Sequence, residues 1–213
     1  MDKEIIYIGD PMCSWCYGFA PVIQTLYAKY KEKIDMRVVV GGLRVGPEHV
    51  VDEQRVTFLR EHWQEVSERT GQNFSMGILD KTGWSYDTEK PCRAVVVMRH
   101  LSPDNVFTYF GAIQSNFYLN NHDPAPVATY ADEAVKFDVD RAEFIALYED
   151  PKTVDETMQD FAWSAQIGIR GFPSVLFRDG EKLSALTLGY QPLEALEAPF
   201  RAWLGLTEAE TVH

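Results

Sequence analysis

The tetrapeptide Cys13-Ser14-Trp15-Cys16 stands where a predicted first strand gives way to a predicted first helix. Ahead of it, residues 5–8 are β-branched or aromatic, and the turn formers Gly9-Asp10-Pro11 follow them. Behind it, apolar residues recur every three or four positions from Phe19 to Tyr30, which predicts one face of a helix. Cys13 is therefore expected at the N-terminus of that helix.

This position favours a dithiol redox centre. The first free N–H groups of a helix and its dipole stabilise an anion, so Cys13 can act as a thiolate nucleophile. Cys16 follows one helical turn later and can close a disulfide with it. The alternative, half of a zinc site, needs four ligands and usually a second close pair. Only Cys92 and scattered histidines remain, so we predict no metal site.

Composition limits the classes of partner. The chain has 213 residues and a formal net charge of −12, which argues against nucleic acid and anionic membranes as partners. Met1-Asp2-Lys3-Glu4 leads directly into the first strand, with no apolar run long enough for a signal peptide or membrane span. We therefore expect a cytoplasmic protein.

The order of predicted elements indicates an α/β thioredoxin fold (βαβ…αββα) with an inserted all-helical domain. A strand at 4–9, a helix at 14–32 and a strand at 36–40 form a βαβ unit with parallel strands. Helical patterns dominate residues 47–150. A helix after Asp150-Pro151, a hairpin over 174–188 with an Asp-Gly turn, and a last helix from Pro192 complete the order. The predicted thioredoxin-like domain thus comprises 1–46 and 151–213, and the insertion 47–150.

Three motifs in this order resemble the DsbA family of thiol-disulfide oxidoreductases, in particular its FrnE-like, cytoplasm-type branch. They are residues 10–19, with the sequence DPMCSWCYGF, then Pro21, and then Gly171-Phe172-Pro173-Ser174. A proline at the depth of Pro21 removes a hydrogen bond and bends a helix. The resemblance implies that the Phe172–Pro173 bond is cis and that this loop faces the cysteines.

Two departures from the family pattern affect the expected chemistry. The better-known oxidants of the family have Pro-His between the cysteines, where Ser14-Trp15 stand here. Many relatives also have a buried acid six residues before the first cysteine, where this chain has Tyr7. We therefore do not expect a strongly oxidising centre, and proton relay to Cys16 must use another group or water.

The resemblance implies a thiol-disulfide oxidoreductase of the reductase or isomerase type, with Cys13 and Cys16 as catalytic residues. An exposed Cys13 attacks a disulfide and a shielded Cys16 resolves the mixed disulfide. Trp15, Phe172 and Pro173 are the expected substrate-binding residues, and the Phe172 backbone groups are expected to pair with an extended substrate. Expected partners are protein or small-molecule disulfides and dithiols, with glutathione as a co-substrate and no cofactor besides the redox-active disulfide.

Two other functions fit the same fold. One is a glutathione-dependent isomerase or transferase that resembles the kappa class, although that class generally has a serine at the position of Cys13. The other is a non-enzymatic adaptor that delivers a client to a protease.

Two side chains outside these motifs have two interpretations each. Cys92 is a buried small hydrophobe or a second redox cysteine, and Arg44 is a solvated loop charge or a carboxylate-binding group.

Overall fold

A four-stranded sheet lies at the centre of the computed structural model, which describes residues 3–81 and 83–206. Its strands are β1 (Lys3–Gly9), β2 (Asp35–Val40), β3 (Ser174–Asp179) and β4 (Lys182–Leu188). They are arranged in the order β2-β1-β3-β4. β1 pairs with β2 in parallel, and the β1–β3 and β3–β4 pairs are antiparallel. This is the sheet of a thioredoxin fold, so the predicted fold class is confirmed.

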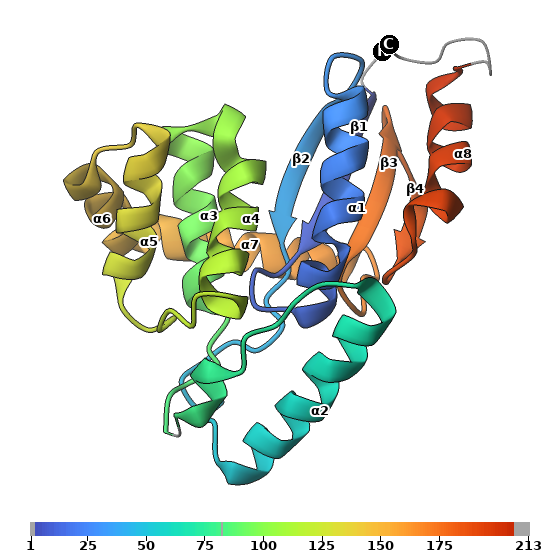
Figure 1. Ribbon diagram of the computed structural model, residues 1–213. Helices are drawn as coiled ribbons and strands as arrows, with labels where there is room; N and C mark the ends of the chain where they lie inside the picture. The colour runs from blue at the N-terminus through green and yellow to red at the C-terminus, as the bar shows by residue number, and fades with distance from the viewer. Residues whose placement is uncertain (1–2, 82, 207–213) are drawn as a thin grey trace.

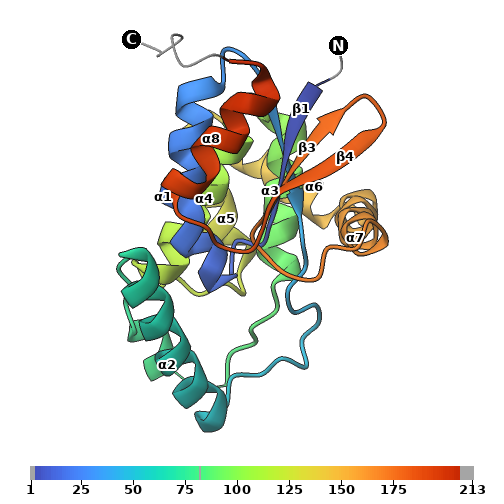
Figure 2. The same cartoon turned by 90° about the vertical axis from the view of Figure 1, so that its right-hand side faces the viewer.

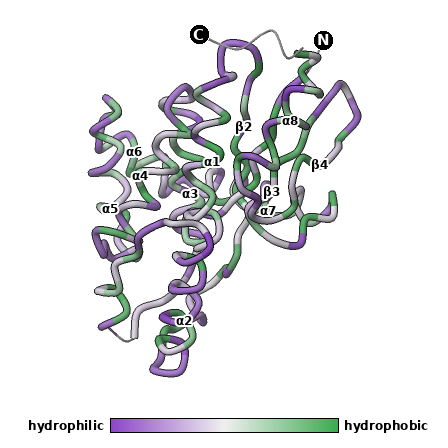
Figure 3. The backbone as a smooth tube through the Cα atoms, turned by 45° about the vertical axis from the view of Figure 1, so that its right-hand side comes forward, coloured by the Kyte–Doolittle hydropathy of each residue, from purple (hydrophilic) through white to green (hydrophobic). Residues whose placement is uncertain are grey.

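The helix α1 (Ser14–Tyr30) connects β1 to β2 and makes the predicted βαβ unit. It contains Pro21 and ends two residues before the predicted end. At the other end of the chain, α7 (Pro151–Gln166) begins as predicted, because the Asp150 side chain accepts a hydrogen bond from the Lys152 N–H. The turn between β3 and β4 is hydrophilic (Figure 3), as expected for a solvent-facing hairpin turn.

The segment between β2 and α7 is mainly helical in its described part. Its β-pairing there is an isolated bridge between Val50 and Ser85. α2 begins at Glu53, because the Asp52 side chain accepts the Arg55 N–H and caps the helix there. In Figure 1, α2 projects below the sheet and the other helices of the segment stand beside it. These elements are α2 (Glu53–Thr70), α3 (Glu89–Leu101), α4 (Val106–Tyr118), α5 (Val127–Ala134), α6 (Arg141–Glu149) and three short 3₁₀ turns (Gly77–Asp80, Pro103–Asn105 and Val135–Phe137).

Alternating residues of β1 face two different layers. Ile5 and Tyr7 pack with residues of α1 and of α8 (Leu193–Leu204). Ile6 and Ile8 point to the opposite face, which the C-terminal part of α7 covers. Figure 2 shows α1 and α8 on one side of the strands and α7 on the other. The sheet is thus the middle layer of three.

Buried side chains link the sheet to the helical segment. One core cluster contains Tyr7 and Phe19 together with Val95 of α3 and Phe110 of α4. A second cluster lies at the N-terminal end of α1, around the fully buried Trp63. Because the first cluster contains residues of both the sheet and the helical segment, the insertion is packed onto the sheet. The boundaries at 46/47 and 150/151 stay a prediction.

Candidate active site

The cysteine pair lies at the N-terminus of α1, at the end that faces α2 (Figure 1). Cys13 is the N-cap residue, with extended backbone angles, and its carbonyl accepts the Tyr17 N–H at 3.0 Å. Cys16 is in the first turn. The two cysteines are free thiols 3.7 Å apart. The local sequence therefore places both sulfurs where it predicted them, at the positive end of the helix dipole.

Cys13 is less accessible than predicted. The residue is only 4% exposed, and Cys16 is fully buried. The expectation of an exposed Cys13 is wrong because the loop before β3 lies directly against it. The Cys13 thiol donates to the Phe172 carbonyl oxygen at 3.6 Å. The order of accessibility, Cys13 above Cys16, is still the one that nucleophile and resolving thiol require.

The Phe172–Pro173 peptide bond is cis, as the resemblance implied. Pro173 is buried, and its carbonyl accepts the Gly189 N–H at 2.7 Å. The Phe172 ring covers Gly41 at the end of β2, where a Cβ atom would lie 2.2 Å from the ring. The structure thus brings Cys13, Phe172 and Pro173 together. The Phe172 carbonyl, which we expected to be free for substrate, accepts the Cys13 thiol here.

Trp15 is half-buried beside the cysteines and belongs to an aromatic and cationic surface. Its ring lies 6.1 Å from the His62 ring and 5.9 Å from the Tyr190 ring, between centroids. The Arg69 guanidinium lies 5.1 Å from the centre of the Trp15 ring. Sequence reasoning missed these three partners, because they come from α2 and from the segment after β4. Burial lowers the pKa of His62; the charge of Glu65 opposes this, and the charge of Arg44 adds to it.

Asp10 is the main site residue that the sequence analysis did not recognise. It is fully buried, three positions before Cys13, and the local sequence indicates only a turn former there. Its Oδ1 accepts the Met12 N–H at 2.8 Å, and its Oδ2 accepts the Leu43 N–H at 2.7 Å. Burial raises the pKa of the Asp10 carboxyl, although these hydrogen bonds oppose the rise. Asp10 thus supplies a buried acid near the cysteines, at a different position from the one that Tyr7 occupies.

Cys92 also contacts Asp10. It is fully buried in α3, and its thiol donates to Asp10 Oδ2 at 3.5 Å. Burial raises the pKa of the Cys92 thiol, and the charge of Asp10 raises it further. Cys92 is therefore packed as a small hydrophobe and also contacts the buried acid. Arg44 lies with its guanidinium 5.0 Å from the centre of the Tyr86 ring.

Burial shifts the pKa of two further groups at the site, Cys16 and Tyr7. Burial raises the pKa of the Cys16 thiol well above its ordinary value, and the hydrogen bond and charge of Cys13 add to this. Burial likewise raises the pKa of Tyr7, and the charge of Cys16 is the next cause. Cys16 is thus held as a neutral thiol behind Cys13, as the resolving partner in an exchange reaction would be.

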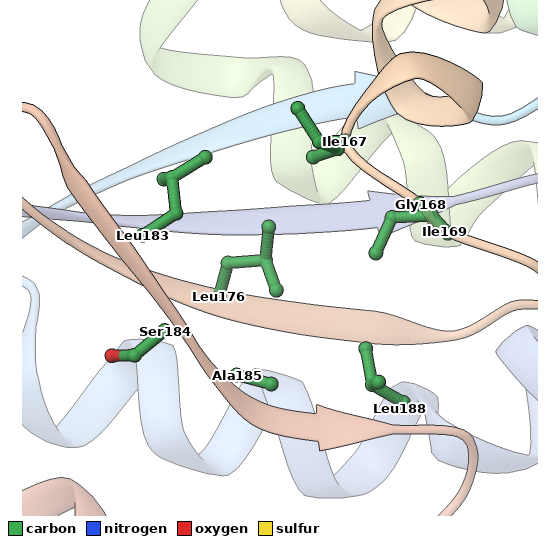
Figure 4. A pocket seen from close by; sticks show the side chains of 8 residues that line it. All are labelled: Ile167, Gly168, Ile169, Leu176, Leu183, Ser184, Ala185 and Leu188. Atoms are coloured by element: carbon green, nitrogen blue, oxygen red, sulfur yellow. The ribbon is translucent and has the colours of Figure 1, made fainter.

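A shallow apolar pocket lies away from this site, between the end of α7 and the β3–β4 hairpin (Figure 4). Its volume is about 180 Å³, and Leu176, Leu183 and Leu188 help to line it. None of the predicted site residues lines this pocket.

Across residues 3–81 and 83–206, no group of three or more His, Cys, Asp or Glu side chains lies close enough to hold a metal ion. In the same ranges no helix has the length and apolar character needed to cross a bilayer.

Residues 5–200 match the family model described as a DSBA-like thioredoxin domain. The structure of a proposed protein disulfide isomerase from Nitrosomonas europaea is 33% identical, with a TM-score of 0.88 over 96% of this chain and 98% of that chain. No curated protein matches the sequence.

Two more distant proteins share the fold. The cytosolic disulfide reductase DsbM from Pseudomonas aeruginosa is 21% identical, with a TM-score of 0.79 over 96% of this chain and 100% of that chain. Its structure with GSH is 22% identical, with a TM-score of 0.77 over 95% and 100%. A 2-hydroxychromene-2-carboxylate isomerase is 13% identical, with a TM-score of 0.67 over 96% and 99%. At these identities the likeness shows the fold alone.

Proposed function

Because the chain belongs to the family of DSBA-like thioredoxin domains, we propose that it is a thiol-disulfide oxidoreductase of the reductase or isomerase type. The observation that carries this proposal is the arrangement of Cys13 between the cis-proline loop and Cys16. The nearer-surface thiol contacts the Phe172 carbonyl, and the second thiol lies behind it without solvent contact.

In the proposed reaction, the Cys13 thiolate attacks one sulfur of a substrate disulfide. A Cys13–substrate disulfide forms, and the other substrate sulfur leaves as a thiolate that takes up a proton. Cys16 then loses its proton and attacks the Cys13 sulfur. A Cys13–Cys16 disulfide forms and the substrate leaves as a dithiol. The protein has given two electrons, and the same steps in reverse oxidise a dithiol.

Glutathione is the co-substrate that we propose for regeneration. Two molecules of the thiol would reduce the Cys13–Cys16 disulfide and leave as one glutathione disulfide, so the reaction needs no bound cofactor. The Arg69 guanidinium beside Trp15 offers a positive charge for a carboxylate next to the sulfurs. The DsbM structure with GSH supports this choice. A reducing compartment such as the cytoplasm would favour net reduction or isomerisation.

Substrate binding is proposed at Trp15, Phe172 and Pro173. A substrate backbone N–H would take the place of the Cys13 thiol at the Phe172 carbonyl, as in strand addition. Trp15 is half-buried and presents apolar surface for the side chain or the glutathione next to the reacting sulfur. Attack by Cys13 and release of its contact with Phe172 would therefore accompany substrate binding.

The test is trapping of the mixed disulfide. The Cys16→Ala variant should accumulate substrate bound to Cys13, identified by mass spectrometry after incubation with oxidised glutathione or a disulfide-bonded peptide. The matched control is Cys13→Ser combined with Cys16→Ala, which should trap nothing. Insulin reduction that persists in Cys13→Ser would overturn the proposal. Reduction of insulin by the wild type, without trapping in Cys16→Ala, would overturn the assigned roles.

A further inference from the structure

Two tyrosines of the helical segment converge on the backbone next to Cys13. The hydroxyl of Tyr86 donates to the Met12 carbonyl oxygen at 2.5 Å, and the hydroxyl of Tyr118 donates to the same oxygen at 2.6 Å. The two hydroxyl oxygens lie 3.4 Å apart. A carbonyl oxygen has two lone pairs, so both acceptor sites of this oxygen are filled by phenols. We call this arrangement the tyrosine clamp.

The clamp acts on the peptide unit that carries the Cys13 N–H. The Met12 C=O and the Cys13 N–H belong to one planar group. The Cys13 N–H donates to the Asp10 carbonyl oxygen at 3.0 Å. The Met12 N–H, in the preceding peptide unit, donates to the Asp10 side chain at 2.8 Å. The Met12–Cys13 peptide plane is therefore held at both of its edges. Its orientation sets where the Cys13 Cα lies relative to the first turn of α1.

Ring packing fixes the positions of the two hydroxyls. Tyr118 is fully buried at the end of α4, stacked on Tyr17 with 4.7 Å between centroids and edge-on to Trp63 at 5.0 Å. Tyr86 is 2% exposed in the loop before α3, and its ring lies 5.4 Å from the Trp84 ring. Neither ring can turn its hydroxyl away without repacking this cluster.

The clamp also lies close to the charge that forms at Cys13. Burial raises the pKa of Tyr118 and of Tyr86, and a negative charge on Cys13 raises both further. The two phenols therefore keep their protons while the Cys13 thiolate is present. Both hydroxyls can therefore donate to the Met12 carbonyl oxygen whether Cys13 is a thiol or a thiolate.

We propose that Tyr86 and Tyr118 are positioning residues for Cys13. By holding the Met12–Cys13 peptide, they keep the Cys13 sulfur at the N-terminus of α1 and against the Phe172 carbonyl. This inference deepens the proposed function and rests on it for its role in exchange. It assigns the helical segment a direct part in the redox site, because both tyrosines come from between β2 and α7.

The test uses Tyr86→Phe, Tyr118→Phe and the double variant, each of which removes only hydroxyl groups. The measured quantity is the rate of Cys13 alkylation by iodoacetamide across pH, with the modified cysteine identified by mass spectrometry. One phenol still satisfies the carbonyl, so each single variant should slow alkylation at neutral pH by about twofold. The double variant should be slower by about tenfold, more than the product of the two singles. Its pH profile should move to higher pH.

Tyr109→Phe is the matched control. Its hydroxyl is also buried on α4 and donates to a backbone carbonyl, that of Tyr130, at 2.9 Å. This variant should lose similar stability in urea unfolding but keep the wild-type alkylation rate and pH profile. Equal slowing in Tyr109→Phe would overturn the proposal, because a general loss of stability would then explain the effect.

The single variants decide the matter if the double variant does not fold. Wild-type alkylation rates in both singles would then refute the clamp. Alkylation does not require disulfide exchange, so this result is separate from the trapping test of the proposed function. A chain that fails to trap substrate but responds to loss of the phenols would refute the reaction and keep the positioning role.

Discussion

Substitution of the buried acid, Asp10→Asn, should change how stability depends on pH. In the folded protein the Asp10 carboxylate accepts hydrogen bonds from the Met12 and Leu43 N–H groups and from the Cys92 thiol. These bonds favour the ionised form, but complete burial disfavours it by more. The pKa of Asp10 is therefore raised from its ordinary 3.8, and the folded protein binds this proton more tightly than the unfolded chain does.

The sign of the effect follows from this difference. The stabilising contribution of the protonated Asp10 is fully present below the unfolded pKa, and it is lost as the pH rises through the folded pKa. One proton changes the free energy of unfolding by at most about 1.4 kcal/mol per pH unit. The neutral amide that the substitution introduces does not titrate in this range. The stability of the wild type minus that of Asp10→Asn should therefore fall as the pH rises, with no steeper slope than this limit.

The assay is equilibrium unfolding in urea from about pH 4 to about pH 7, below the range in which the thiols of the unfolded chain ionise. Both proteins are kept reduced with a phosphine, so that the cysteine pair stays in one redox state. The difference between them cancels the titration of every other carboxyl group. A difference that rises with pH would refute the reasoning, since the hydrogen bonds to Asp10 would then outweigh its burial.

Substitution of Cys92 separately tests the balance between burial, which raises the pKa of Asp10, and hydrogen bonds, which lower it. The Cys92→Ala variant loses a hydrogen bond that lowers the Asp10 pKa, and Cys92→Ser keeps a donor at the same position. The fall in stability with pH should therefore extend to higher pH in Cys92→Ala than in Cys92→Ser. Coincident curves would show that the thiol contributes nothing to the ionisation of Asp10.

Two further substitutions test the packing of the site. Gly41→Ala places a Cβ atom 2.2 Å from the Phe172 ring, so it should displace that ring and slow insulin reduction. The control is Gly171→Ala, because a Cβ atom there meets nothing within 4 Å. Equal rates of insulin reduction in the two variants would contradict this. Trp63→Ala should lower the free energy of unfolding by about 3–5 kcal/mol in guanidinium titrations. Trp63→Phe should lower it by less, partly because the indole nitrogen has no hydrogen-bond partner among the described residues, and equal losses would count against this reasoning.

The parts of the fold that follow local patterns could be predicted from the sequence. The β3–β4 hairpin and the start of α7 at Pro151 both lie within short motifs. The cis bond before Pro173 was implied by the family resemblance and not by a local pattern. Contacts between distant segments could not be predicted in this way. Asp10 resembles an ordinary turn former because its partners Leu43 and Cys92 lie 33 and 82 residues away. The limited exposure of Cys13 depends on Phe172, which lies 159 residues away, and no local sequence pattern predicts that contact.

These distant contacts bear on what the helical segment contributes to the molecule. The peptide before Cys13 contains a buried carbonyl at Met12, and Asp10 places a buried carboxylate beside it. Donors stabilise both groups, because an unpartnered buried polar group costs about 1–3 kcal/mol. Tyr86, Tyr118 and Cys92 are among these donors, and all three come from the segment between β2 and α7. A chain shortened to the sheet and its own helices would leave the loop before Cys13 without these partners, so the segment is a structural part of the candidate site.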